Sequence, residues 1–164
     1  MSTPHATNER SQIAIKFAAD RMLGRLAKWL RVLGYDVIYG PHLTGYGLIR
    51  AARAEGRLIL TRDRRLKHKQ PPEFVFIESD HYRDQLRQVV RAYRLELAGK
   101  QFTRCLRCNC LLEIRPKETV ERLVPGYVFT TQEKFSWCSQ CRRVYWAATH
   151  QQKMVEELGK ISAP

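Results

Sequence analysis

Apolar residues in the first hundred positions follow two alternating patterns. Short runs of β-formers, such as residues 58–61, fit strands buried on both faces of a sheet. Longer segments place apolar residues at helical spacing. The patterns predict strands at residues 13–18, 36–39, 58–61 and 74–77, and helices at residues 21–33, 48–55 and 82–97.

Strands that alternate with helices indicate an α/β fold with a mainly parallel sheet between two layers of helices. The composition changes near Gly99, where a second, smaller unit begins. We therefore divide the chain into a disordered polar tail at residues 1–12, an α/β domain at 13–100, a small unit at 101–149 and a terminal helix or tail at 150–164.

Three acidic residues follow predicted strands: Asp20, Asp63 and Asp80. The carboxyl ends of parallel strands meet at one edge of a sheet, so we expect these side chains to converge there. Carboxylates held together repel one another, and a divalent cation is the usual compensation. A simpler interpretation of Asp63 is that it caps the next turn or pairs with a neighbouring arginine.

The charge balance favours an anionic partner. The 164 residues include 29 Lys and Arg against 16 Asp and Glu, a formal net charge of +13. Such a balance points to nucleic acid, although a ribosome-bound or merely adhesive basic protein would share it. The cations closest to the acids are the predicted nucleic-acid contacts: Arg21, Arg25, Lys28, Arg62, Arg64 and Arg65.

A simpler account also exists for the cations of the first helix. Arg21, Arg25, Lys28 and Arg31 are spaced by four, three and three, so they share one side of that helix. A solvent-exposed outer face would produce the same pattern.

Four of the five cysteines form two Cys-x-x-Cys pairs, Cys105 with Cys108 and Cys138 with Cys141. Four thiolates at this spacing suit tetrahedral zinc, and so small a unit needs such support to fold. A disulfide or redox role is the alternative. Cys110 is the odd thiol, expected as a small buried or partly exposed side chain and not as a ligand.

The sequence shows neither an apolar stretch long enough to cross a membrane nor the apolar segment of a signal peptide. We therefore expect a cytoplasmic protein with no membrane partner.

From Phe17 to Met154 the chain resembles the Mut-seven C-terminal RNase domain, a PIN-like nuclease fold followed by a zinc ribbon. The resemblance rests on DRMLGRLAKWLR at residues 20–31, LGYD at 33–36, EGR at 55–57, LTRD at 60–63, TRC at 103–105, CN at 108–109, WC at 137–138 with Cys141, VYW at 144–146 and His150. It implies a ribonuclease whose Asp20 and Asp63, and less firmly Asp80, hold Mg²⁺ or Mn²⁺.

One departure from the family divides the functional hypotheses. Where such chains carry a run of acids at the start of the second helix, residues 44–47 read Thr-Gly-Tyr-Gly, and no carboxylate lies between Asp36 and Glu55. The leading hypothesis is a metal-dependent ribonuclease that prefers single strands. The alternative is a catalytically impaired protein that binds structured RNA, such as tRNA or rRNA, without cutting it.

Overall fold

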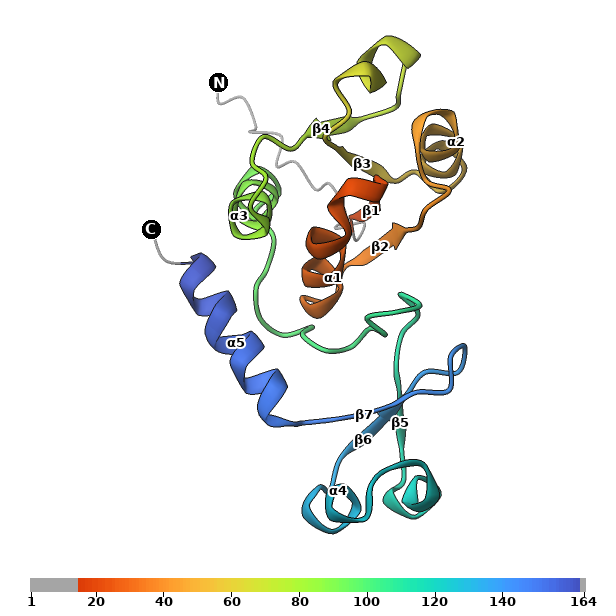
Figure 1. The fold of residues 1–164 in the computed structure, drawn as a ribbon, viewed down its shortest axis with the longest axis vertical. Helices are drawn as coiled ribbons and strands as arrows, with labels where there is room; N and C mark the ends of the chain where they lie inside the picture. Colours follow the sequence, from red (N-terminus) through yellow and green to blue (C-terminus); the bar gives the residue numbers. More distant parts are fainter. Residues whose placement is uncertain (1–14, 163–164) are drawn as a thin grey trace, which may run out of the picture.

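The first lobe is built on a four-stranded parallel sheet. The computed structural model describes residues 15–162, so the predicted tail at residues 1–12 and the start of the first predicted strand lie outside the described residues. The strands follow the order β2-β1-β3-β4 (Figure 1). They are β1 Lys16–Ala19, β2 Asp36–Tyr39, β3 Leu58–Thr61 and β4 Phe74–Phe76.

Alternating side chains bury both faces of this sheet. Phe17 and Ala19 of β1 pack into the larger core, on the side of α1 (Gly24–Val32) and α3 (Tyr82–Tyr93). Ala18 between them packs into a smaller core under α2 (Gly45–Glu55). In β3 all four residues are buried, and Ile59 lies on the α2 side. The predicted strand buried on both faces is therefore confirmed.

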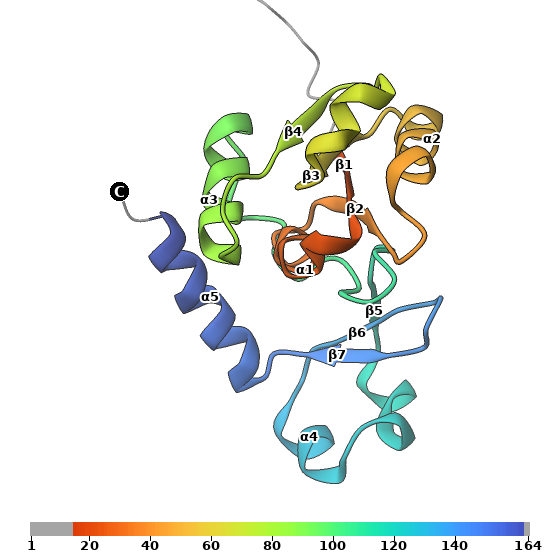
Figure 2. The same cartoon turned by 45° about the horizontal axis from the view of Figure 1, so that its top comes forward.

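Helices cover the two faces and give three layers. They are α1 Gly24–Val32, α2 Gly45–Glu55 and α3 Tyr82–Tyr93, with 3₁₀ turns η1 Arg21–Leu23 and η2 Arg64–Lys69. Figures 1 and 2 show α2 on one side of the sheet and α1 with α3 on the other. The predicted α/β class with a parallel sheet flanked by helices is confirmed.

The second lobe is a three-stranded antiparallel sheet in the order β5-β6-β7. Its elements are β5 Glu113–Arg115, η3 Lys117–Thr119, η4 Glu121–Leu123, α4 Gly126–Thr131, β6 Phe135–Trp137 and β7 Val144–Trp146. Its own core is small, formed by Val120, Val128 and Phe135. Such a core needs additional support to remain folded.

The last helix returns to the first lobe. Helix α5, Thr149–Ser162, runs back beside α3 in both views (Figures 1 and 2). Met154, Leu158 and Ile161 are buried in the larger core together with Phe17. None of the helices in residues 15–162 is both long and apolar enough to cross a membrane.

The start of α2 and the end of α3 differ from the predicted ones for local reasons. Helix α2 starts at Gly45, three residues early, because Thr44 is extended and its carbonyl accepts the first helical hydrogen bonds, from Gly47 and Leu48. Helix α3 stops at Tyr93, four residues early, because Arg94 adopts a left-handed conformation with φ 49°. Glycine is the usual residue at such an ending, so an arginine there does not signal the end of a helix.

The position of Arg31 corrects one prediction. A solvent-exposed face, the simpler account of the side shared by Arg21, Arg25, Lys28 and Arg31, does not hold for Arg31, which is only 6% exposed. Its guanidinium donates to the carbonyl of Val37 (2.8 and 3.0 Å) and to two carbonyls of the second lobe, at residues 106 and 107 (3.0 and 3.1 Å). These carbonyls keep the charge hydrogen-bonded on burial, so Arg31 joins the lobes.

Candidate functional site

Asp20 lies at the carboxyl end of β1 and is 4% exposed. Its Oδ1 accepts the backbone N–H of Met22 (2.8 Å) and so caps η1. Its Oδ2 accepts the Thr61 hydroxyl (2.6 Å) and the backbone N–H of Arg62 (2.8 Å). The carboxylate thus ties the ends of two neighbouring strands together and is held in one orientation.

Asp63 follows β3 and caps η2. Its Oδ1 accepts the backbone N–H of Arg65 (2.9 Å) and the Nε–H of the same residue (3.1 Å). These two donors hold the pKa of Asp63 below its usual value, so the side chain is a carboxylate at neutral pH. The capping role and the arginine pair weighed from sequence are both present, and the side chain remains 27% exposed.

The two carboxylates line one pocket of about 360 Å³. Four cations also line it, namely Arg21, Arg62, Arg65 and Lys69. The remaining lining residues are Met22, Thr44, Gly45, Leu48, Thr61 and Leu66. The pocket combines fixed negative charge with a larger number of positive groups, an arrangement that can receive a phosphate and a cation together.

The other predicted site residues lie outside this pocket. Asp80 is 83% exposed and pairs with the guanidinium of Arg62, which also donates to the Ser79 carbonyl (3.0 Å). Asp80 and Arg25 line a neighbouring pocket of about 420 Å³, and Met22 lines both. The predicted contacts Arg64 and Lys28 are exposed and line neither pocket.

Sequence reasoning missed two polar residues of the pocket. Lys69 ends η2, and its Nζ lies 4.7 Å from the ring centre of Tyr46, at the start of α2. Thr61 donates to Asp20 and accepts the backbone N–H of Asp63 (3.0 Å). Thr61 could have been found from its place before Arg62 at a strand end, whereas Lys69 becomes recognisable only once η2 is known to fold back over α2.

The carboxylates fit one divalent cation better than two. Asp20 already accepts three hydrogen bonds, and Asp63 uses Oδ1 for both of its bonds from Arg65. No third carboxylate lines the pocket among the described residues, since Thr44 and Gly45 occupy the start of α2. Mg²⁺ needs only one or two carboxylates when water completes its shell, so Asp20 and Asp63 could hold one ion.

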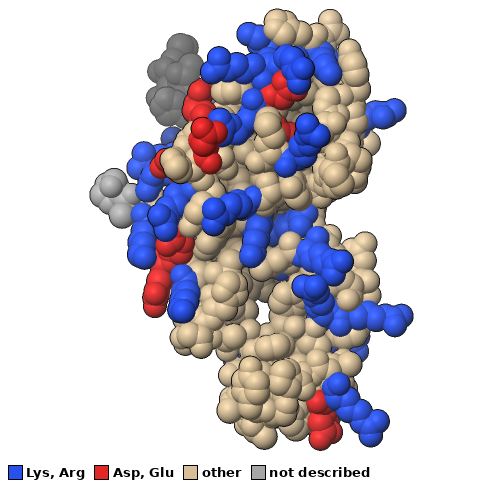
Figure 3. Space-filling view, in the orientation of Figure 1, with Lys and Arg blue, Asp and Glu red and all other residues tan. Residues whose placement is uncertain are grey.

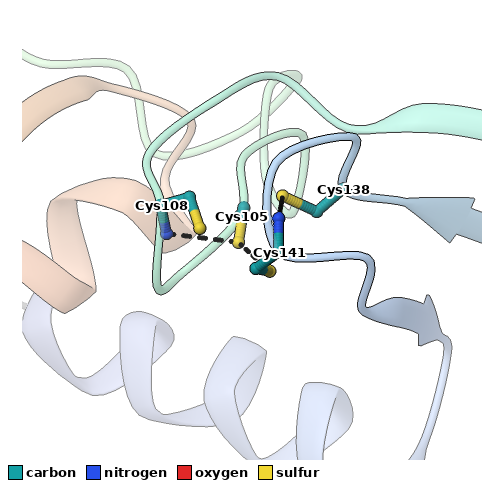
Figure 4. Close-up of side chains that lie close together, drawn as sticks. All are labelled: Cys105, Cys108, Cys138 and Cys141. Carbon is teal, nitrogen blue, oxygen red and sulfur yellow. Dashed lines mark hydrogen bonds between the residues drawn. The ribbon is translucent and has the colours of Figure 1, made fainter.

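The four cysteines of the two pairs form a second candidate site. Their sulfur atoms all lie within 4.8 Å of one another, and within residues 15–162 they are the one group of three or more His, Cys, Asp or Glu side chains gathered in this way. Figure 4 shows the two loops facing each other. Four thiols in this arrangement could bind a metal such as zinc.

Both loops have the same local geometry. The backbone N–H of Cys108 points at the Cys105 sulfur (3.3 Å), and that of Cys141 points at the Cys138 sulfur (3.4 Å). The residue after each pair is left-handed, with φ 69° at Asn109 and 58° at Arg142. N–H groups aimed at sulfur stabilise thiolates, which are the form that binds metal.

The thiols differ in their readiness to ionise. Burial opposes ionisation of Cys138, but the N–H of Cys141 and the neighbouring thiols outweigh it and lower the pKa of Cys138 to about 6. Burial and the sulfur atoms of Cys141 and Cys105 raise the pKa of Cys108 to about 12. A cation would favour ionisation of all four, so metal binding should release protons.

Positive side chains dominate the face shown in Figure 3. Lys and Arg spread over the first lobe and along one side of the second, and Asp and Glu are fewer there. The lowest part of the second lobe is mostly uncharged in this view. This face of the first lobe is therefore suited to a polyanion.

Comparison with models of known protein families gives a match. The model of a family described as the Mut7-C RNAse domain matches residues 15–158. The chain belongs to the Mut7-C RNAse domain family. Membership indicates a nuclease-like, RNA-related function, with RNA as substrate or partner. Separate comparisons with curated proteins and with solved structures found no match.

The Mut7-C RNAse domain match spans both lobes and most of α5, so it contains both the pocket and the four cysteines. The family resemblance inferred from the sequence motifs is confirmed. The match gives no role to any single residue.

Proposed function

We propose that this protein is a metal-dependent ribonuclease whose reaction takes place in the pocket of Asp20 and Asp63. The observation that supports this most is the approach of these carboxylates from neighbouring parallel strands into a space lined by four cations. Family membership supports the choice of RNA as the substrate in this proposal.

Each side chain has a distinct task in this proposal. Arg21 and Lys69 bind the phosphates of the RNA strand, and Arg62, positioned by Asp80, faces the same pocket.

Asp20 and Asp63 would hold one Mg²⁺ or Mn²⁺. When bound, such an ion provides a water of lowered pKa and positive charge beside the phosphate. Asp20 is fixed by its three hydrogen bonds, so its carboxylate needs no reorganisation during the reaction.

An exposed aromatic ring favours single-stranded RNA. Tyr46 is 67% exposed and lies beside Lys69, next to Gly45 of the pocket. Unpaired bases stack on exposed rings while cations contact the phosphates, and a duplex keeps its bases inside.

A cleavage assay tests the proposal. Labelled unstructured and structured RNAs are incubated with the protein, with Mn²⁺, Mg²⁺ or a chelator. We expect metal-dependent cleavage of the unstructured RNA and a loss of about a hundredfold or more in Asp63→Asn. Glu121→Gln, on the second lobe, is the control and should cleave normally. Cleavage that survives both Asp63→Asn and the chelator would exclude this mechanism.

A second candidate function is RNA binding without cleavage. It is favoured by Thr44 and Gly45, which place no carboxylate at the start of α2, and by the hydrogen bonds already made by both acids. It predicts tight, salt-dependent binding of structured RNA and no product at any metal concentration. A product that disappears in Asp63→Asn would rule it out.

For the cysteine cluster we propose a structural zinc held by Cys105, Cys108, Cys138 and Cys141. The small core of the second lobe supports this, since Val120, Val128 and Phe135 alone bury little surface. Elemental analysis of the purified protein should give one zinc per chain. A folded second lobe without metal would contradict the proposal.

A further inference from the structure

The fifth cysteine lies against the metal-binding cluster. The sulfur atoms of Cys110 and Cys138 are 3.1 Å apart, closer than Cys105 and Cys141 at 3.7 Å. The Cys110 carbonyl accepts the backbone N–H of Cys105 (2.9 Å), which fixes Cys110 across its loop. Cys110 is nevertheless not one of the four thiols that gather as a metal group.

We propose that Cys110 and Cys138 are an oxidation site, in which a disulfide between them removes one of the four zinc ligands. The inference goes beyond the ribonuclease and rests on the proposed zinc. A disulfide needs a sulfur separation near 2.05 Å, so the two atoms must approach by about 1 Å.

The exposure of the two thiols determines which of them is oxidised first. Cys110 is partly exposed, whereas Cys138 is fully buried. A peroxide therefore meets Cys110 first. Its sulfur attacks the peroxide, the O–O bond breaks, and sulfenic acid and water form. The Cys138 sulfur then attacks the Cys110 sulfur, the S–S bond forms, and the S–OH bond breaks to release a second water. Two thiols and one hydrogen peroxide give one disulfide and two waters.

The proposed reaction has a structural consequence. With Cys138 in the disulfide, three thiols of the cluster remain, and a site of three thiolates holds zinc less firmly than one of four. The loop of Cys105 and Cys108 also carries Asn109, which bonds to the first lobe. Loss of zinc should therefore loosen the contact between the lobes.

Hydrogen peroxide treatment of the zinc-loaded full chain, with a chromogenic zinc chelator present, tests this proposal. We expect zinc release near one equivalent of peroxide, a mass loss of two hydrogens, peptides joined through Cys110 and Cys138, and recovery with dithiothreitol and zinc. Cys110→Ser keeps all four proposed ligands and should release zinc about tenfold more slowly.

Three results would overturn the proposal: equal release rates in the wild type and Cys110→Ser, peptides joined through another cysteine pair, or no disulfide at all. Cys110→Ala provides a second variant if the serine alters folding, which circular dichroism will show. Absence of zinc in the untreated protein would refute the proposed metal, while the peptide map would still decide whether this pair oxidises.

Discussion

Asp36 stands away from the pocket, yet its carboxylate joins three parts of the chain. Its Oδ1 accepts from the Arg57 guanidinium (2.6 Å) and from the Asn109 amide (2.8 Å) of the second lobe. Burial would raise the pKa of Asp36, but these hydrogen bonds outweigh it and lower the pKa. The folded protein therefore favours the ionised form, and this stability is lost as the pH falls through the lowered pKa.

The first prediction concerns this carboxylate. Asp36→Asn should lower the free energy of unfolding by about 2 kcal/mol at pH 7, because hydrogen bonds to a charged group are lost. The difference from the wild type should shrink below pH of about 4, where the unfolded chain is protonated. Urea denaturation at pH 7 and 3 measures both effects. Asp84→Asn, which breaks an exposed pair with Arg87, is the control, and equal losses in the two variants would contradict the argument.

A second prediction at this scale concerns Lys69. If Lys69 contacts a phosphate of a single strand, Lys69→Ala should make the plot of log affinity against log salt shallower by about 0.7. Lys67→Ala is the control, since Lys67 lies in the same 3₁₀ turn but does not line the pocket. Fluorescence anisotropy with a labelled oligonucleotide and no divalent metal measures the slopes. Identical slopes in all three proteins would remove Lys69 from the interface.

At the scale of elements, the end of α3 provides a stability test. Arg94 has φ 49° and ψ 47°, a conformation that glycine adopts without strain. Arg94→Gly should stabilise the protein by about 0.5–1 kcal/mol, and Arg94→Ala should give no gain because it removes the same side chain and keeps the strain. Midpoints of urea denaturation compare the two. A gain in the alanine variant would show that the side chain, and not the backbone, is responsible.

Elements with strong patterns were predictable, and those fixed by tertiary contacts were not. The strands β2 and β3 have the predicted bounds because their apolar runs and flanking glycines are local signals. The predicted end of α3 was wrong because Arg94 adopts a left-handed conformation that is uncommon for arginine. The solvent-exposed position considered for Arg31 was wrong because helical spacing does not show which arginine a second lobe will cover.

The residues of the candidate site were likewise predictable where a local pattern placed them, and not where tertiary contacts did. Asp20 and Asp63 could be named because a parallel sheet brings the ends of its strands together. Asp80 was expected beside Asp20 and Asp63 but lies outside their pocket, because residues 77–79 separate it from the end of β4 and its exposed side chain pairs with Arg62. The Cys110–Cys138 contact depends on how two distant loops pair, which no spacing rule gives.

For the whole molecule, the zinc proposed at the four cysteines should affect the stability of both lobes. The main chain of Phe102 donates to the Val32 carbonyl (2.8 Å), and Arg31 and Asn109 add further bonds between the lobes. We expect a strong chelator to lower the melting temperature by several degrees or more, with signals from both lobes changing together. Hydrogen exchange resolved by peptide measures this. Loss of protection confined to the second lobe would show that the lobes are energetically independent.

Helix α5 has one further consequence. Because the chain leaves the first lobe, forms the second, and then returns three apolar side chains to the first core, a cut after β7 would expose the surface that Met154, Leu158 and Ile161 cover. We therefore expect that the first lobe does not fold stably without α5. Fusion partners and affinity tags are better placed outside residues 15–162, and nascent chains should stay vulnerable to aggregation until α5 has left the ribosome.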